Sequence, residues 1–278
     1  MSEQVLRVFI LALDGLEYNV VSKLRLRNLM QVVCGYINIS GFQNLLTPVI
    51  WTSFITGKEP SEHGIFSWWR FSRYKWLDKI AHWVRYNMPI VRNMSSTKLK
   101  RTLRILGLKP HPPSRKDLKV PTLFDLIKSS IALFVPGYNE EDWIRDFYSE
   151  AFERDIGEAE KAVWCVHEYR KRKLFEELER NKCWELFMVW FDLADWIGHL
   201  YMGKSKLKIM KAYFELDRLA ARVKKVAPEG TLFIIVSDHG MEHEGHHSPR
   251  AFYSFNIDLG WRPKKITDYF NFILSVLA

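Results

Sequence analysis

Aspartate and histidine residues recur at similar places in this sequence, each close behind a strongly apolar stretch. Asp14 and Asp238 follow such stretches directly, and Asp195 follows a third within a few residues. Histidines accompany two of these acids: His199 lies four residues after Asp195, and His239 is next to Asp238. Carboxylates that share a crevice repel one another unless cations neutralise them. Carboxylate together with imidazole is a ligand mix that suits zinc and related divalent ions.

A second histidine pair, His246-His247, follows Gly245 and adds to the candidate ligands. With about six such ligands, two metal ions are more natural than one, and two ions roughly 3.5–4 Å apart form the clamp used for in-line displacement at phosphorus. Each residue also has a structural interpretation by itself. Asp14 could be a turn residue, Asp195 a helix cap and the histidine pair a polar surface loop. All of these coincidences together are a weaker explanation than a metal site.

Phosphoryl transfer also needs a nucleophile, and hydroxyls cluster in the stretch from Thr47 to Gly57. A hydroxyl beside a divalent cation has a lowered pKa and can attack phosphorus. The chemistry alone does not choose among the four hydroxyls of this stretch, Thr47, Thr52, Ser53 and Thr56. Thr47 precedes Pro48, so it could equally be an ordinary helix N-cap.

The elements that must position these residues can be predicted from apolar patterning. Dense apolar stretches typical of buried strands span residues 5–13, 31–39, 131–135, 184–191 and 231–237, and a further apolar stretch occupies 251–255. Helices are expected over 123–128, as one or two amphipathic helices within 140–180, over 206–226 with Ser205 as N-cap, and from Thr267.

Strands that alternate with helices predict an α/β fold with a mostly parallel central sheet flanked by helices. We expect a single domain over residues 1–278. In open α/β sheets the ligand site lies in the loops beyond the carboxyl ends of the strands. The acids that follow the strands are therefore expected to converge on one crevice.

Composition limits the class of protein. Hydrophobic residues make up 47% of the 278 residues and charged residues 26%, which are ordinary values for a globular chain and exclude a disordered or collagen-like one. Three cysteines without regular spacing argue against a disulfide framework. The first 14 residues do not resemble a signal peptide, and no uncharged apolar stretch is long enough to span a membrane. We expect a soluble cytoplasmic protein.

Positive charge is concentrated in one segment, residues 66–119. It holds 14 lysines and arginines against 2 acids, a local charge of +12 in a chain of net charge +9. Aromatic residues interleave with these cations. We expect an insertion whose aromatics pack on the main domain, or a peripheral surface for anionic membranes, in which case the protein could be membrane-associated. A surface for single-stranded nucleic acid is less favoured.

Five motifs, in this order, resemble those of the alkaline phosphatase superfamily. They are Leu-Asp14-Gly, Thr47-Pro-x-x-Trp-Thr-Ser-x-x-Thr-Gly-x-x-Pro60-x-x-His63-Gly64, Asp195-x-x-Gly-His199, Ser-Asp238-His239-Gly-Met and Gly-x-His247-Ser. Within the superfamily, the chain is most similar to the type I phosphodiesterase/nucleotide pyrophosphatase family in its short prokaryotic and archaeal forms. The resemblance implies an alkaline-phosphatase-like fold.

The resemblance also implies a site with two zinc ions. One ion would be held by Asp14, Thr47, Asp238 and His239, and the other by Asp195, His199 and His247. Thr47 would be the nucleophile that is transiently phosphorylated, so the resemblance selects it over the other hydroxyls. It prefers His247 to His246 as a ligand, and it implies a structural role for His63.

The resemblance predicts metal-dependent hydrolysis of a small-molecule or lipid-like phosphoester, a diester rather than a monoester. Many nucleotide pyrophosphatases have an asparagine three residues after the nucleophile, where this chain has Ile50. Stabilisation of the phosphate must then come from the metals, backbone N–H groups or another side chain. The alternatives are a phosphomonoesterase or phosphotransferase on the same site, or a lipid- or nucleic-acid-binding protein whose catalysis has decayed. The filled ligand positions argue against decay.

Overall fold

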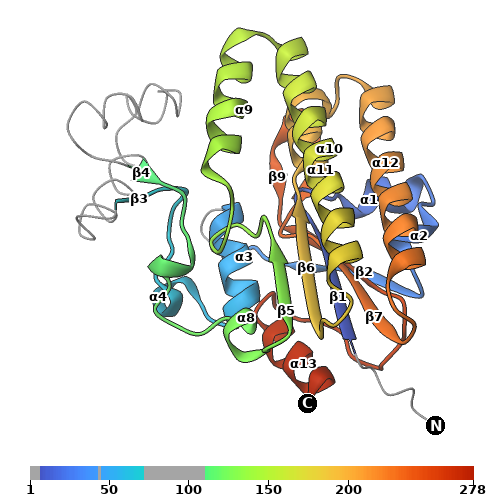
Figure 1. Ribbon diagram of the computed structural model, residues 1–278. Coiled ribbons are helices and arrows are strands. Elements are labelled where there is room, and N and C mark those ends of the chain that lie inside the picture. The colour runs from blue at the N-terminus through green and yellow to red at the C-terminus, as the bar shows by residue number, and fades with distance from the viewer. Residues whose placement is uncertain (1–6, 43–44, 72–109) are drawn as a thin grey trace.

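The computed structural model describes residues 7–42, 45–71 and 110–278. Its centre is a six-stranded sheet in the order β2-β10-β7-β1-β6-β5 (Figure 1). The strands are β1 (Arg7–Leu13), β2 (Val33–Asn38), β5 (Ser130–Leu133), β6 (Leu186–Phe191), β7 (Thr231–Val236) and β10 (Arg250–Phe255). β1 pairs in parallel with β6 and β7, and β5 pairs in parallel with β6. β10 is antiparallel to both β7 and β2, so the predicted mostly parallel sheet is confirmed.

The three central strands are buried along almost their whole length. Every residue of β6 and β7 is buried, as is all of β1 except its first residue, and their sequences show no polar alternation. Such continuous apolar stretches are typical of parallel strands covered on both faces. Phe9 of β1 stacks on Phe187 at 5.0 Å and on Phe233 at 5.1 Å between ring centroids, across the two strand pairs. These aromatic contacts fix the register of the strands whose ends carry the candidate ligands.

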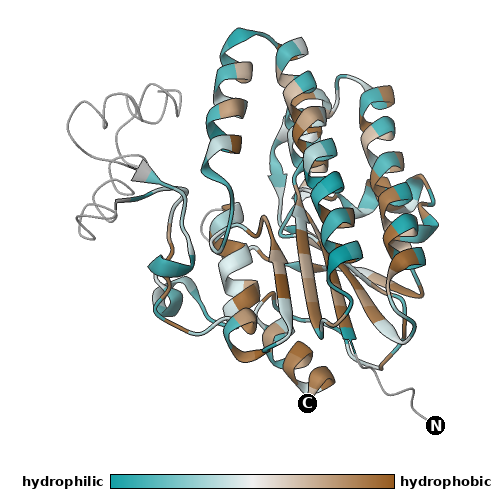
Figure 2. Cartoon of the chain, in the orientation of Figure 1, coloured by the Kyte–Doolittle hydropathy of each residue, from teal (hydrophilic) through white to brown (hydrophobic). Residues whose placement is uncertain are grey.

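Helices flank the sheet. They are α1 (Tyr18–Lys23), α2 (Arg27–Met30), α3 (Thr47–Thr56), α4 (Pro60–His63), α8 (Leu123–Leu126), α9 (Asp142–Arg154), α10 (Ile156–Arg180), α11 (Leu193–Tyr201), α12 (Lys206–Val226) and α13 (Asp268–Leu277). Short 3₁₀ turns are η1 (Arg115–Asp117) and η2 (His243–Gly245), and short strands are β3 (Arg70–Phe71), β4 (Pro110–His111), β8 (Gly240–Met241) and β9 (His247–Ser248). Figure 2 shows largely hydrophobic central strands beside long helices that alternate hydrophobic and hydrophilic residues.

The two longest predicted helical regions form helices. α12 has the predicted bounds, and its four apolar residues at helical spacing, Tyr213, Leu216, Leu219 and Val223, are all buried. The 140–180 region forms two helices, α9 and α10, which pack side by side as a helical hairpin (Figure 1). Asp155 separates them, and its side chain accepts a hydrogen bond from the Glu158 N–H at 2.9 Å as the N-cap of α10.

The basic segment 66–119 is described only at its two ends, where β3 pairs with β4 in antiparallel fashion. Residues 72–109 lie outside the described part of the chain, and so do most of the charges behind the predicted membrane or nucleic-acid surface. At the N-terminal end of this segment, the Arg145 guanidinium of α9 lies 4.5 Å from the Trp68 ring centroid and 5.4 Å from that of Trp69. These two tryptophans therefore pack against the main body. None of the helices in the described residues has the length and apolar character needed to cross a bilayer.

Candidate metal centre

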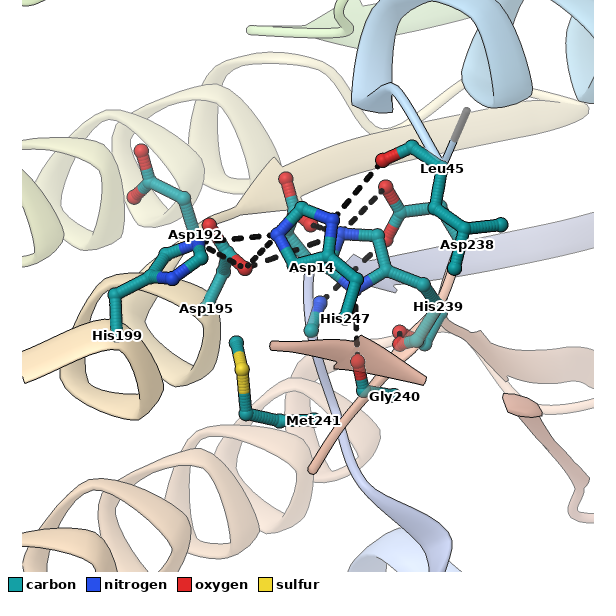
Figure 3. Close-up of polar contacts among 12 residues, drawn as sticks. Asp14, Leu45, Asp192, Asp195, His199, Asp238, His239, Gly240, Met241 and His247 are labelled. Atoms are coloured by element: carbon teal, nitrogen blue, oxygen red, sulfur yellow. Dashed lines mark hydrogen bonds and ion pairs between the residues drawn. The ribbon is translucent and has the colours of Figure 1, made fainter. Parts of the chain in front are cut away.

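Acids from the ends of three neighbouring strands meet at one point (Figure 3). Asp14 follows β1, Asp238 follows β7, and Asp195 lies in the first turn of α11 just after β6. His239 Nε2 lies 3.2 Å from Asp14 Oδ1, 3.6 Å from Asp238 Oδ2 and 3.8 Å from Asp195 Oδ1. The sheet order β7-β1-β6 brings together residues more than 220 positions apart in the sequence.

Two further histidines complete a second group around Asp195. His199 lies one turn later on α11, and its Nε2 is 3.4 Å from Asp195 Oδ1. His247, from β9, places its Nε2 3.4 Å from the same oxygen and 3.0 Å from His199 Nε2. The ligand atoms of Asp195, His199 and His247 all lie within 4.8 Å of one another, as do those of Asp14, Asp238 and His239. The structure thus brings together six of the seven sequence-predicted site residues in two adjoining groups.

Several of these atoms are buried and have no hydrogen-bond partner among the described residues. This observation tests whether the residues fit a metal. The atoms are Asp14 Oδ1, Asp195 Oδ1, Asp238 Oδ2 and His239 Nε2. A buried polar atom without a partner costs free energy, and native structures contain few of them. Four such atoms directed at one point, all from residue types that bind zinc, fit a cation site. We therefore identify these residues as able to hold divalent metal.

In two of the histidines, a hydrogen bond from Nδ1 to a backbone carbonyl determines which ring nitrogen faces the site. His239 Nδ1 lies 3.0 Å from the Gly240 carbonyl oxygen, and His247 Nδ1 lies 3.0 Å from the Leu45 carbonyl oxygen. A carbonyl only accepts, so each Nδ1 carries the proton and donates. The lone pair is then on Nε2, which faces the acids in both cases. Such outer hydrogen bonds are usual for metal-binding histidines, because they fix the orientation of the ring.

The electrostatics of Asp14 and Asp195 differ. Burial, together with the carboxylates of Asp238 and Asp195, raises the pKa of Asp14 well above its usual value. Burial also opposes ionisation of Asp195, but His199 and His247 beside it hold its pKa well below the usual range. Asp195 in turn raises the pKa of His199 against the opposing effect of burial. A bound cation would allow both groups of carboxylates to be ionised together.

Two glycines permit the close approach of the loops. Gly15 has φ +67°, and a Cβ there would lie 2.6 Å from the Asp195 Cα. Gly245 has φ +77°, and a Cβ there would lie 2.9 Å from the Cα of His199. Positive φ and the missing side chain are both needed at these positions. They let the end of β1 and the loop before His247 close onto α11.

Glu17 holds the loop that carries His247, and the sequence gives no signal of this role. Its carboxylate is buried and accepts hydrogen bonds from the Met241 N–H at 3.0 Å and from the Ser248 hydroxyl at 3.1 Å. An ion pair with Arg250 at 3.4 Å adds a third contact. Nothing in its spacing distinguishes Glu17 from a surface glutamate, because its partners lie more than 220 residues away.

The candidate nucleophile lies at the start of α3. Leu46 is the N-cap, Thr47 is the first helical residue and Pro48 follows it, so Thr47 is not the N-cap. The residue two positions before Thr47 is Leu45, whose carbonyl accepts from His247 (Figure 3). Thr47 is buried, and within the described ranges its hydroxyl has no hydrogen-bond partner.

The three alternative hydroxyls of α3 are engaged within the fold. Thr52 donates to the Pro48 carbonyl at 2.6 Å, and Thr56 donates to the Thr52 carbonyl at 2.6 Å. Ser53 lies 3.0 Å from His63 Nε2. Since His63 Nδ1 accepts from the Ile65 N–H at 3.1 Å, the proton is on Nε2 and His63 donates to the serine. This histidine cannot act as a base toward Ser53, and its two ring nitrogens are both occupied.

The remaining histidines lie apart from the centre. His246 is exposed, whereas its neighbour His247 points into the centre. His167, Glu168 and Glu215 form a third group with close ligand atoms between α10 and α12. Lys171 lies within it, with Nζ 2.7 Å from Glu215 and 2.5 Å from Glu168. Because an ammonium already neutralises those carboxylates, we interpret the third group as an ion-pair network.

Comparison with known proteins places most of the chain in one family. The family model for the type I phosphodiesterase / nucleotide pyrophosphatase matches residues 8–253. This range contains all the residues of the candidate metal centre. It begins in β1 and ends in β10, so it spans the whole central sheet.

Individual relatives share little sequence identity with this chain. A curated relative, GPI ethanolamine phosphate transferase 3 of Saccharomyces cerevisiae, is 27% identical over 103 residues, which cover 34% of this chain and only 10% of the yeast protein. The PH0037 protein of Pyrococcus horikoshii is 12% identical, with a TM-score of 0.52 over 98% of each chain. An inactive variant of murine ectonucleotide pyrophosphatase/phosphodiesterase 5 in complex with AMP is 15% identical, with a TM-score of 0.46 over 84% of this chain and 57% of that one. The PH0037 likeness supports a shared fold.

Proposed function

The chain belongs to the type I phosphodiesterase/nucleotide pyrophosphatase family, and from this premise we propose that it hydrolyses phosphodiesters in a metal-dependent reaction. One observation carries the proposal: beyond the strand ends, three carboxylate oxygens lie within 3.8 Å of His239 Nε2, and none of these four buried atoms has a hydrogen-bond partner in the described part of the chain. A phosphoester brings negative charge to a site whose carboxylates already repel one another. Divalent cations are the ligands that remove both repulsions.

We assign the two groups of ligand atoms to two divalent ions, with zinc as the metal that suits this carboxylate and imidazole donor set. The first ion would be held by Asp14, Thr47, Asp238 and His239, and the second by Asp195, His199 and His247. When bound, the ions would supply Lewis-acid stabilisation of charge on the phosphoryl oxygens. The carbonyls that fix His239 and His247 support this assignment, because they place the lone pair of each neutral ring on Nε2, the nitrogen that faces the acids.

Thr47 is the proposed nucleophile. Its hydroxyl oxygen would form a bond to phosphorus while the bond from phosphorus to the leaving-group oxygen breaks, with the hydroxyl proton released and the leaving group protonated. Water would then cleave the phosphothreonine. Two features support Thr47: its hydroxyl makes no competing hydrogen bond with the residues that the structure describes, and the N-terminus of α3 favours negative charge on a neighbouring oxygen. Ile50, fully buried on the same helix, offers the phosphate no polar contact.

Phosphoryl transfer to an alcohol is the second candidate function. The match to a yeast ethanolamine phosphate transferase favours it, although that match covers one third of this chain. Both reactions would share the phosphothreonine, which either water or an alcohol could attack. The two functions therefore differ in the acceptor and not in the first step.

The test is hydrolysis of bis-p-nitrophenyl phosphate and p-nitrophenyl phosphate by zinc-loaded protein, with Thr47→Ala and Thr52→Ala in parallel. Thr52 is the matched control, since it is a buried threonine of the same helix whose hydroxyl bonds to Pro48. We expect diester turnover, a loss of at least about 100-fold in Thr47→Ala, and less than about tenfold in Thr52→Ala. Unchanged turnover in Thr47→Ala would overturn the nucleophile.

Three additional results would redirect the proposal. Added ethanolamine or glycerol that accumulates as its phosphoryl derivative, at the expense of hydrolysis, would favour the transferase. Faster cleavage of the monoester than of the diester would favour a phosphomonoesterase. Protein that holds zinc but turns over neither substrate would favour a decayed enzyme.

A further inference from the structure

A buried ion pair lies behind the second ligand group. Arg170 of α10 is fully buried, and its guanidinium donates through Nη1 to Asp192 Oδ1. The Tyr148 hydroxyl of α9 donates to the same oxygen at 3.2 Å. The other oxygen, Asp192 Oδ2, accepts from Trp196 Nε1 of α11 at 3.2 Å. One carboxylate thus receives donors from three helices.

Asp192 is placed where it can set the position of α11. It follows β6 directly and is the residue before the helix, and its carbonyl accepts from the Trp196 N–H at 3.1 Å. Asp195 and His199 lie on the next turns of the same nine-residue helix. Backbone and side-chain contacts of Asp192 therefore both fix the turn from which these two ligands project.

Trp196 extends this contact to a ligand. Its ring lies 5.9 Å from the His199 ring, and on its other sides it packs against Tyr148 at 5.1 Å and Phe152 at 4.7 Å between centroids. The helical hairpin α9–α10 thus supports both the carboxylate before α11 and the indole beside His199. None of these contacts involves Asp14, Asp238 or His239.

Stability alone is a poor explanation for this arrangement. The Arg170 guanidinium lies 4.5 Å from the Trp190 ring centroid and 5.6 Å from that of Phe134, and its Nε and Nη2 have no hydrogen-bond partner in the described part of the chain. The desolvation cost of a buried charge can exceed the gain from its ion pair, and apolar residues of similar volume often stabilise as well. What the pair provides in addition is a fixed geometry.

We infer that the Arg170–Asp192 pair positions the Asp195–His199–His247 group. Through this pair, the helical hairpin α9–α10 contributes to the geometry of the metal centre. The inference rests on the proposed function to the extent that this group holds a metal ion. Residues that orient metal ligands typically contribute about 10–100-fold to metal affinity. The effect should be largest at this group, because the ligands of the other group lie at the ends of β1 and β7, where the Asp192 carboxylate acts on Asp14 electrostatically.

The experiment measures zinc affinity at each group separately, by competition with a chromophoric chelator. His239→Ala weakens the first group and isolates the second, and His199→Ala does the reverse. Arg170→Met is then introduced into both backgrounds. We expect zinc binding to weaken about 10–100-fold in the His239→Ala background and by less than about threefold in the His199→Ala background. A purely structural role would weaken both alike.

The matched control is Arg145→Met. Arg145 is a largely buried arginine on the same hairpin, and it pairs with Glu140 at 2.5 Å but contacts the tryptophans of the basic segment instead of α11. It should leave zinc affinity unchanged in both backgrounds. Two milder variants cover the case in which Arg170→Met does not fold. Tyr148→Phe removes one donor and should weaken the second group about threefold, and Arg170→Lys retains a cation and should recover part of the affinity.

The outcomes separate this inference from the proposed function. Equal zinc affinity in Arg170→Met and its parent, or an equal loss at both groups, overturns the positioning role and leaves the proposed hydrolysis standing. Parent protein that binds no zinc overturns both. A loss at the second group alone supports the inference even if no phosphodiester has been found that the protein cleaves.

Discussion

His63 and His239 are both fully buried histidines, and their ring nitrogens have different surroundings. At His63, the Ile65 N–H donates to Nδ1 and Nε2 contacts the Ser53 hydroxyl, so both nitrogens are paired within the chain. At His239, Nδ1 pairs with the Gly240 carbonyl, whereas Nε2 has three carboxylates within 4 Å and no hydrogen bond.

The difference teaches how to separate a structural histidine from a candidate ligand when both are buried. Burial removes water, so every polar atom needs a partner from the chain or from a bound group. The surroundings of His63 are complete, and the imidazole stays neutral there because burial lowers its pKa to about 4. At His239, a bound cation would complete the surroundings of Nε2. Four predictions test this contrast, in order of decreasing effect.

Metal removal should have the largest effect. A ligand at 100 times its Kd stabilises the folded state by about 2.7 kcal/mol, so two occupied sites contribute about 5 kcal/mol. We expect EDTA to lower the melting temperature of zinc-loaded protein strongly, as followed by circular dichroism. Readdition of zinc should restore it. Identical melting with and without EDTA would contradict a metal centre.

Substitution of the two histidines should separate activity from stability. His239→Ala should lower kcat/KM for a phosphodiester at least about 100-fold, or about 3 kcal/mol, since even residues that only orient metal ligands typically contribute 10–100-fold. His63→Gln should change kcat/KM less than about threefold while lowering the melting temperature. Comparable losses of activity in both variants would contradict the assignment of His239 as a metal ligand and His63 as a structural histidine.

The pH dependence of stability should report on His63. Its pKa is about 4 in the folded protein and about 6.5 when unfolded, so protonation favours the unfolded chain. The stability it contributes is present above pH 6.5 and is lost as the pH falls toward 4, by about 2 to 3 kcal/mol. Urea unfolding of metal-free parent and His63→Gln at pH 7, 5.5 and 4 checks this. The gap between the two proteins should narrow at low pH, and a constant gap would contradict the assignment.

The third histidine group should show the smallest effect. Glu215 contacts His167 and Lys171, and these contacts lower its pKa to about 2. Since Glu215 is only partly buried, solvent screening limits the contribution of its ion pair. Glu215→Gln should cost about 1 kcal/mol and leave the number of bound zinc ions unchanged. A lower zinc count in this variant would make the group a metal site.

Much of this protein could be predicted from the order of its residues. The apolar stretches predicted five of the six strands of the sheet, because strands buried on both faces leave continuous hydrophobic sequence. The alternation of strands with helices predicted a mostly parallel sheet, and the motifs predicted the family. The convergence of the three acids followed from the rule that the loops beyond parallel strand ends form the site, and the resemblance to the family selected Thr47 and His247.

The sequence did not indicate the supporting residues. Glu17, Arg170 and Asp192 look like ordinary charged residues in the linear sequence, and Asp192 belongs to none of the five motifs although it follows a strand directly. Their roles depend on partners in other elements, such as Tyr148 on α9 and Ser248 on β9. No local spacing encodes such pairs, because each partner is set by how two distant elements pack.

The sequence by itself determined the residue types, their order along the chain and the strand after which each one falls. The tertiary structure decided which of them face one another. It brought six of the candidate ligands into the two groups that the resemblance implied. Among the described residues, it left Nε2 of His239 without a hydrogen-bond partner, paired both nitrogens of His63, and placed an ammonium inside the third group. The reason is physical: hydrophobic patterning acts over a few residues, whereas the pairing of buried polar atoms is settled only when sheet order and helix packing bring them into contact.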